Sequence, residues 1–211
     1  MGVNDPALLE RLAERIVQNT RPHPLRVAID GVTAAGKTTL ADELVAPLRA
    51  RGRPVIRASV DGFHRPRAER YRCGADAPQG YYYDAFDYPA LRRALLLPLG
   101  PGGDRHYRLS TLDLAVDQPV NVPHHDAPPD AVLLCDGVFL LRPELDDCWD
   151  FRIFMQVDEA TAVRRAGQRD RHLFGGVERT KARYWQRYIP AHRLYLAQVQ
   201  PQTRADVIVK P

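Results

Sequence analysis

The sequence predicts an α/β fold in which a mostly parallel β-sheet is covered by helices on both faces. Short apolar runs alternate along the chain with longer segments of helical spacing, which is typical of such a sheet. The apolar runs expected to form strands are residues 25–30, 55–60, 131–137, 151–158 and 205–209. A glycine-rich segment follows the first run and precedes a helix. This order also favours the fold, because ligands of parallel sheets bind at the carboxyl ends of strands.

Length and composition indicate a single globular domain over residues 1–211. The chain is 45% hydrophobic and 27% charged, which is ordinary for a folded protein. No apolar run approaches the ~18 residues that a membrane-spanning helix needs. The acidic residues Asp5, Glu10 and Glu14 make the N-terminus unlike a signal peptide. We therefore expect a cytoplasmic protein without a membrane partner.

The chain is basic, with a formal net charge of +4 and a pI of about 9.1. This charge would permit contact with nucleic acid, but the arginines are spread along the sequence and no nucleic-acid-binding motif is present. Anionic small substrates and solvated helix faces explain the charge more simply. We expect no nucleic-acid partner, and exposed helices leave a homo-oligomer open.

Helical spacing of apolar residues, with breaking residues at the ends, predicts the helices. They are expected at residues 6–18, 38–51, 88–97, 159–168 and 179–200. Asn4 or Asp5 is the expected cap of the first helix, and Pro190 should interrupt the last. Residues 62–87 are polar and aromatic without a clear period, so we expect a long functional loop. Residues 100–130 contain two alternating patches and should form either a β-hairpin flap or a long connection.

A phosphate-binding motif lies between the first strand and the helix after it. Residues 31–38 read Gly-Val-Thr-Ala-Ala-Gly-Lys-Thr and fit the P-loop pattern G-x-x-x-x-G-K-[ST]. The glycines let backbone N–H groups wrap around a phosphate at a helix N-terminus. Lys37 can reach the β- and γ-phosphates, and the Thr38 hydroxyl can bind Mg²⁺. The candidate nucleotide-binding residues of the loop are Gly31, Thr33, Ala34, Ala35, Gly36, Lys37, Thr38 and Thr39. A glycine-rich turn that binds nothing is the alternative.

Acidic residues end three apolar strands and should lie near the triphosphate. Asp136 is the candidate for supporting Mg²⁺, with Asp61 as a competitor and a simple strand-end turn at Gly137 as the alternative. Asp61 begins the long loop, where an acceptor could lie. We therefore expect Asp61 to orient an acceptor hydroxyl and take its proton. Asp158 ends the third of these strands.

The aromatic segment 81–89 supplies candidates for acceptor binding. Asp84 and Asp87 could bind hydroxyl groups of a ribose or polyol, although a cap for the helix that follows explains Asp87 equally well. Phe63 belongs to an aromatic group that could stack on a base or pack in the core. Tyr107 is a further candidate contact with the substrate.

Arginines follow the strand that ends at Asp158. Arg165 and Arg169 are four residues apart, so they lie on the same face of the expected helix. They precede a Gly-Gly pair. Arginines that enter a glycine-containing loop suit a mobile lid, here residues 169–180, that closes over phosphates. We expect Arg165 to contact the nucleotide and Arg169 to act with Lys37 and Asp61 in catalysis. A solvated basic helix face is the alternative.

Taken together, these motifs resemble the uridine kinase/phosphoribulokinase family of P-loop kinases. The matching segments are residues 31–39, 59–63, 86–89, 134–137, 165–170 and 205–209. The resemblance implies a parallel five-stranded core with a lid, and transfer of the γ-phosphate of ATP, with Mg²⁺, to a hydroxyl of a small molecule. A nucleoside is the favoured acceptor. The resemblance also implies Asp61 as the catalytic carboxylate, and Arg165 and Arg169 as lid arginines.

The chain departs from that family at positions that bear on the acceptor. Uridine kinases have Glu where Asp136 stands. Tyr107 is the candidate match for their pyrimidine-reading Tyr, but no His follows it at a suitable place. Residues 173–179 replace the lid motif Glu-Arg-Gly-Arg. Pantothenate and sugar kinases share the scaffold, so their acceptors are alternatives, as is a nucleotide-binding switch protein that transfers nothing.

Overall fold

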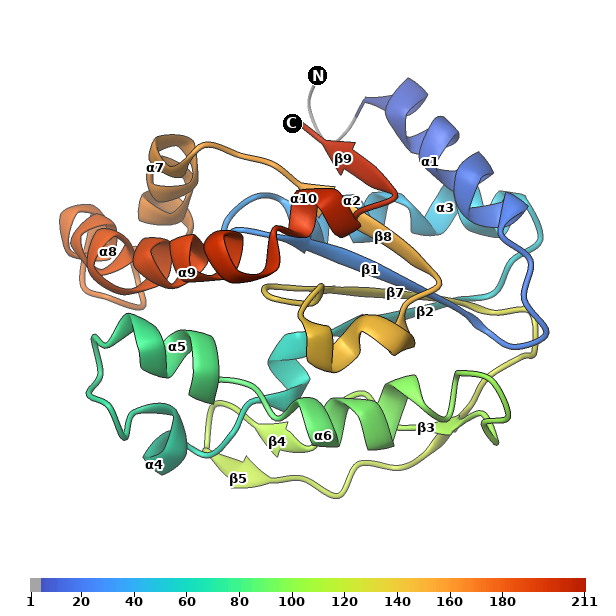
Figure 1. The fold of residues 1–211 in the computed structure, drawn as a ribbon, viewed down its shortest axis with the longest axis horizontal. Coiled ribbons are helices and arrows are strands. Elements are labelled where there is room, and N and C mark those ends of the chain that lie inside the picture. The colour runs from blue at the N-terminus through green and yellow to red at the C-terminus, as the bar shows by residue number, and fades with distance from the viewer. Residues whose placement is uncertain (1–4) are drawn as a thin grey trace.

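The computed structural model describes residues 5–211 and confirms the predicted α/β fold (Figure 1). The strands of the main sheet are β1 (Leu25–Gly31), β2 (Val55–Ser59), β7 (Val132–Gly137), β8 (Phe151–Met155) and β9 (Val207–Val209). They are all parallel and run in the order β2-β7-β1-β8-β9. Every residue of the central strand β1 is buried, as expected for a strand covered on both faces.

Helices cover both faces of this sheet, and each face has its own apolar core (Figure 1). One core contains residues of α1 (Pro6–Gln18), α2 (Lys37–Glu43), α3 (Val45–Ala50) and α7 (Glu159–Arg169). The other contains residues of α5 (Pro78–Asp84), α6 (Tyr88–Leu91), the short helix η3 (Pro143–Cys148) and α9 (Ile189–Val199). A four-residue helix, α10 (Pro201–Arg204), leads into β9.

The helix predicted over residues 38–51 is divided in two. Its parts, α2 and α3, meet at Leu44. Pro47 has no N–H group to donate to the carbonyl of Glu43, four residues earlier, so the ladder of helical hydrogen bonds cannot run straight through. At the first helix, Asp5 is the cap, and its carboxylate accepts a hydrogen bond of 3.0 Å from the amide of Ala7. Asn4, the other candidate cap, lies outside the described residues.

Two predicted helices contain a wider π-turn. The first consists of α6 and the π-turn η2 (Arg92–Leu96). The last consists of α8 (Val177–Arg183), the π-turn η4 (Tyr184–Tyr188) and α9. The expected interruption at Pro190 is therefore a change of helical pitch just before the proline, because the missing N–H group shifts the hydrogen-bond ladder.

Short helices occupy the region for which the sequence predicts a loop. They are the 3₁₀ turn η1 (Val60–Phe63), α4 (Arg67–Arg70) and α5. The prediction of an irregular loop over residues 62–87 was wrong for these parts. Helices of four and seven residues are too short to show a clear apolar period, which explains the error.

The excursion at residues 100–130 forms small antiparallel pairs. Strand β3 (His106–Tyr107) pairs with β6 (His125–Asp126), and β4 (Leu112–Asp113) pairs with β5 (Gln118–Pro119). The sequence left a β-hairpin flap or a long connection open for residues 100–130, and the structure shows the hairpin. Asp117, between β4 and β5, accepts a 2.8 Å hydrogen bond from the guanidinium of Arg70 on α4. The hairpin is thereby held against α4.

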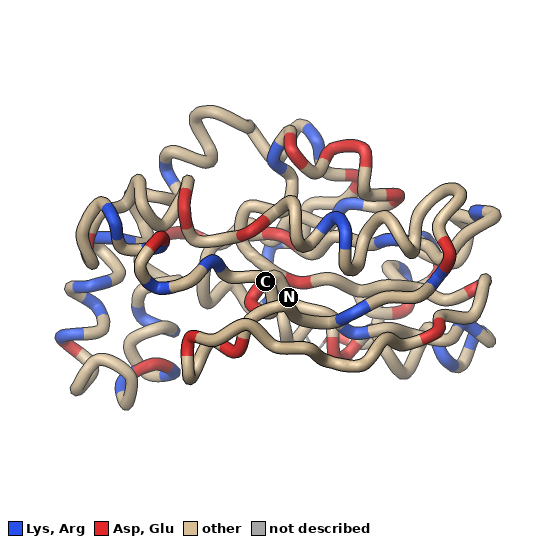
Figure 2. Tube along the Cα trace, turned by 90° about the horizontal axis from the view of Figure 1, so that it is seen from below, with Lys and Arg blue, Asp and Glu red and all other residues tan. Residues whose placement is uncertain are grey.

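Charged residues of both signs are interspersed along the trace (Figure 2). Within residues 5–211, no helix combines the length and the apolar character that crossing a membrane would require.

Candidate active site

The loop between β1 and α2 turns sharply through left-handed backbone conformations. Ala34 has a φ of 65° and Gly36 a φ of 97°. Residues in this conformation turn successive N–H groups toward one point, which suits a phosphate, and Gly36 adopts it without a clashing Cβ. At the start of the loop, a Cβ on Gly31 would lie 2.5 Å from the carbonyl oxygen of Met155. The loop therefore needs glycine at position 31 because it lies directly against β8.

Lys37 is buried in this loop. Its side chain is 8% exposed, and its Nζ donates a hydrogen bond of 2.9 Å to the carbonyl oxygen of Val32. Burial lowers the pKa of Lys37 to about 8, against the opposing attraction of Asp30 and Asp136. A phosphate within reach of Nζ would favour the charged form again. The side chain is thus held ready for an anion.

Thr38 and Asp136 meet although they are far apart in the sequence. The Thr38 hydroxyl donates to Oδ2 of Asp136 at 2.6 Å, and a guanidinium nitrogen of Arg57 donates to Oδ1 at 3.0 Å. Sequence reasoning did not identify Arg57. An arginine within the otherwise largely apolar strand β2, which lies beside β7, was the available signal.

Asp30 is a second residue that sequence reasoning did not identify. It is fully buried at the end of β1 and accepts hydrogen bonds from the Gly31 amide at 2.7 Å, from the Leu141 amide at 3.3 Å and from the Tyr195 hydroxyl. Burial raises the pKa of the Asp30 carboxyl group. These contacts fix the backbone where the phosphate-binding loop begins.

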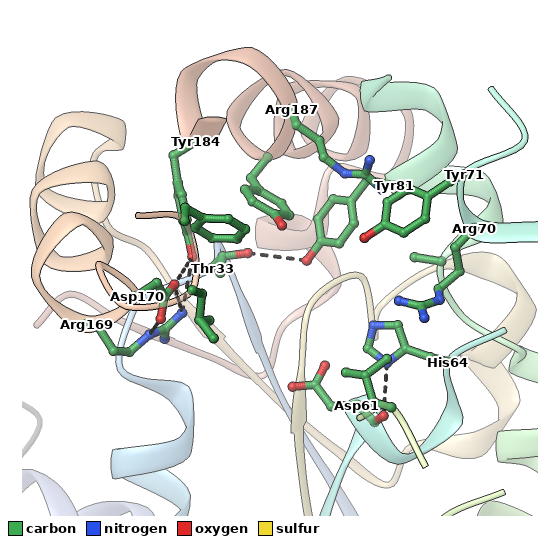
Figure 3. A pocket seen from close by; sticks show the side chains of 15 residues that line it. Thr33, Asp61, His64, Arg70, Tyr71, Tyr81, Arg169, Asp170, Tyr184 and Arg187 are labelled. Atoms are coloured by element: carbon green, nitrogen blue, oxygen red, sulfur yellow. Dashed lines mark hydrogen bonds and ion pairs between the residues drawn. The ribbon is translucent and has the colours of Figure 1, made fainter. Parts of the chain in front are cut away.

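Two cavities open beside the loop. The loop cavity, of about 350 Å³, is lined by Ala34, Gly36, Lys37, Thr38, Thr39, Arg165 and Arg169. The Asp61 cavity, of about 280 Å³, is shown in Figure 3 and lies between the loop, α4, α5 and η4. Its size is just below the range of about 300–1,000 Å³ that is typical of small-molecule sites. Arg169 lines both cavities.

Asp61 projects into the cavity named after it (Figure 3). It is exposed and lies in η1, directly after β2, where the Ser59 hydroxyl accepts a 3.3 Å hydrogen bond from the Asp61 amide. Ser59 pairs with Asp136 in the register of β2 and β7. The carboxylates of Asp61 and Asp136 therefore follow neighbouring strand ends, as the sequence led us to expect.

The arginines of α7 lie over the phosphate-binding loop. A guanidinium nitrogen of Arg165 donates to the Ala35 carbonyl oxygen at 3.4 Å. Arg169, the last residue of α7, donates to both carboxylate oxygens of Asp170, at 2.7 and 2.9 Å, and this pairing raises its pKa. The structure thus brings Arg165 and Arg169 together with Lys37 and Thr38 at the loop cavity.

Two predicted acceptor contacts have structural partners instead. Asp84 is buried and accepts hydrogen bonds of 2.7 and 3.1 Å from the guanidinium of Arg72. Asp87 caps α6, where its carboxylate accepts a 2.8 Å hydrogen bond from the Ala90 amide. Neither carboxylate lines the Asp61 cavity. The structure shows the helix-cap alternative for Asp87.

The remaining candidates also lie outside the Asp61 cavity. Phe63 is fully buried in one of the apolar cores. Tyr107 is 8% exposed and packs against His125, with ring centroids 5.5 Å apart. Asp158 caps α7 by accepting a 2.8 Å hydrogen bond from the Thr161 amide. The structure therefore does not bring these side chains to the two cavities.

Much of the Asp61 cavity wall comes from residues that sequence reasoning missed. The π-turn η4 supplies Tyr184, Arg187 and Tyr188. Arg70 comes from α4, and His64 follows η1. Pro190 was the only sequence signal for the π-turn, and it does not reveal which side chains the turn presents.

A phosphate-binding loop after the central strand of a parallel sheet, with acidic residues at neighbouring strand ends, is the arrangement of P-loop kinases. No family model matches the chain. The chain is 29% identical over 161 residues to a uridine kinase of Leuconostoc citreum (strain KM20), covering 70% of this chain and 69% of that protein. It is 26% identical over 164 residues to uridine-cytidine kinase A of Dictyostelium discoideum, covering 70% of this chain but only 28% of that protein.

Solved structures show the same likeness over nearly the whole chain. A possible uridine kinase from Bacillus stearothermophilus has a TM-score of 0.74 and 25% identity, with 95% of this chain and 96% of that chain covered. A candidate fructose transport system kinase from Silicibacter sp. TM1040 has a TM-score of 0.76 and 25% identity, with 95% and 98% covered. The resemblance to uridine kinase-like P-loop kinases that the sequence predicts is confirmed by these comparisons.

Proposed function

We propose that the chain is a kinase that uses ATP and Mg²⁺ to phosphorylate a hydroxyl group of a small molecule, with a ribonucleoside as the first candidate acceptor. One observation carries the proposal. The cavity lined by Lys37 and Thr38 and the cavity that contains the Asp61 carboxylate share Arg169 in their walls. A nucleoside is the first candidate because curated relatives are named uridine kinase.

In the proposed reaction the acceptor oxygen forms a bond to the γ-phosphorus of ATP. The bond from that phosphorus to the β–γ bridging oxygen breaks, and ADP leaves with the electron pair. The proton of the acceptor hydroxyl passes to the Asp61 carboxylate. Lys37 and the loop amides bind the phosphates, and Arg169 neutralises charge that develops during transfer.

The residues at the loop also suit Mg²⁺. The Thr38 hydroxyl and the Asp136 carboxylate offer oxygen ligands, and they lie within 2.6 Å of each other. When bound, Mg²⁺ neutralises phosphate charge. Arg57 holds the Asp136 carboxylate in place from its other oxygen.

A sugar is the second candidate acceptor. The structural neighbour described as a fructose transport system kinase has a TM-score of 0.76, as high as that of the uridine kinase-like structure. A sugar offers several hydroxyl groups to Asp61 just as a ribose does.

The test measures ADP release with ATP, Mg²⁺ and a panel of ribonucleosides, 2′-deoxynucleosides, sugars and pantothenate. Asp61→Asn should lower kcat by about 10²- to 10⁴-fold while ATP binds as before, because the amide cannot accept the proton. Lys37→Ala should weaken ATP binding as well. Asp130→Asn, at an exposed residue away from both cavities, is the matched control.

The outcomes separate the alternatives. Phosphorylation of a sugar or pantothenate alone would refute a nucleoside as the acceptor but would still support the kinase function. ATP binding without transfer to any acceptor would instead favour a nucleotide-binding switch protein. Full activity of Asp61→Asn would remove Asp61 from catalysis.

A further inference from the structure

The arginines of the Asp61 cavity differ in whether their charge is paired. Arg169 is paired with Asp170, and Arg70 donates to Asp117 at 2.8 Å. Arg187 forms no ion pair within the described residues 5–211. It is therefore the cation of this cavity whose charge the protein itself does not balance.

Arg187 is also deeply buried. Its residue is 2% exposed, and both Nε and Nη1 are buried without a hydrogen-bond partner in the described part of the chain. Leaving a buried charged donor unpaired is costly, and natural proteins rarely do so. The Nε of Arg70, on the same cavity, is likewise buried without a partner among residues 5–211.

Aromatic rings hold the Arg187 guanidinium in place. Its central carbon lies 4.7 Å from the ring centroid of Tyr71, 5.6 Å from that of Tyr81 and 6.0 Å from that of Tyr188. Aromatic rings stabilise a guanidinium by stacking against its flat face, which leaves its N–H edge without acceptors. Its N–H groups point outward in the plane of the group and still need acceptor atoms. A planar edge of this kind matches the two oxygens of a carboxylate or phosphate.

The position of Arg187 indicates which ligand would supply those oxygens. Arg187 lines the Asp61 cavity, the proposed acceptor site, and does not line the loop cavity. Figure 3 shows Arg187 and Asp61 on opposite sides of the Asp61 cavity. The two residues therefore line one cavity.

We propose that the acceptor carries an anionic group, a carboxylate or a phosphate, that pairs with the N–H edge of Arg187 while its reacting hydroxyl faces Asp61. This inference rests on the proposed kinase function and narrows its substrate class to acidic hydroxyl compounds. Arg70 adds a second positive charge to the same wall.

The test compares acceptors in matched pairs that differ only in the charged group. Suitable pairs are pantothenate with pantothenol, fructose 6-phosphate with fructose, and orotidine with uridine. In the wild type the anionic member of the active pair should have a kcat/KM about 10- to 100-fold higher, the range expected for hydrogen bonds to a charged group. The pair that responds also shows whether the group is a carboxylate or a phosphate.

Variants assign the preference to Arg187. Arg187→Met should abolish most of the difference within the pair, mainly through KM, and Arg187→Lys should restore part of it. Arg193→Met removes an exposed arginine of α9 that pairs with Glu159 and should leave the preference unchanged. Thermal unfolding of each variant checks that it is folded.

Three results would overturn the inference. Equal use of the neutral and anionic members by the wild type would refute it while leaving the kinase function intact. An undiminished preference in folded Arg187→Met would show that a residue other than Arg187 binds the anionic group. Transfer to no acceptor in these pairs or in the wider panel would refute the kinase function itself, and this inference with it.

Discussion

His192 should make the protein lose stability in mild acid. It is 7% exposed on α9, and burial, followed by the positive charge of Lys37, lowers its pKa from the ordinary value of 6.5 to about 4. As the pH falls, the unfolded chain takes up a proton at His192 before the folded chain does. The stability that a neutral His192 allows is therefore complete above pH 6.5 and is lost as the pH falls toward 4.

The size of this loss follows from the two pKa values. Between about pH 8 and about pH 5, the difference between the pKa values of His192 in the unfolded and folded chain lowers the free energy of unfolding by about 2 kcal/mol. That is a large share of the roughly 5–15 kcal/mol that stabilises a typical domain. Urea unfolding at the two pH values measures it directly.

A matched pair of variants isolates the effect. His192→Gln removes the titrating group, so its unfolding free energy should fall by about 2 kcal/mol less than that of the wild type over the same pH interval. His124→Gln, at an exposed histidine, should behave like the wild type. If His192→Gln lost as much stability in acid as the wild type, the reasoning from burial would be refuted.

Two further predictions concern the loop cavity. Thr38→Val removes the hydroxyl that lies 2.6 Å from Asp136, so it should raise the Mg²⁺ concentration needed for half-maximal activity. Thr39→Val is the control and should leave that concentration unchanged. Identical Mg²⁺ titrations of the two variants would exclude Thr38 as a ligand. Arg169→Ala should lower kcat by about 10³-fold, more than it raises the acceptor KM, because its charge acts in the transition state. Arg171→Ala, outside both cavities, is the control, and a change in KM alone would make Arg169 a binding residue.

The sheet and the phosphate-binding loop could be predicted because their signals are local. Five apolar runs and one contiguous motif are sufficient to place β1, the loop and α2. The proximity of Thr38 and Asp136 also follows, since the carboxyl ends of parallel strands meet at one edge of the sheet. No comparable rule exists for Arg57, whose contact with Asp136 depends on the order of β2 and β7 in the sheet.

The acceptor candidates show why side chains are harder to place than strands. Asp84 and Asp87 stand in a segment that reads as a substrate loop, but each carboxylate is used by a neighbour. Arg72 neutralises the buried Asp84, and the first turn of α6 uses Asp87 as its cap. Nothing in a local pattern distinguishes an aspartate that awaits a ligand from one that already has a partner.

The two halves of the site therefore differ in how their specificity is encoded. The loop cavity is built mainly on the backbone of residues 34–39, with Arg165 and Arg169 of α7 added, so most of its signature is contiguous. The Asp61 cavity is built from side chains of distant segments, including Arg70 on α4, Tyr81 on α5, Leu114 beside β4 and Arg187 on η4. If the proposed function holds, we expect substitution of one such side chain to change the acceptor without changing the nucleotide site.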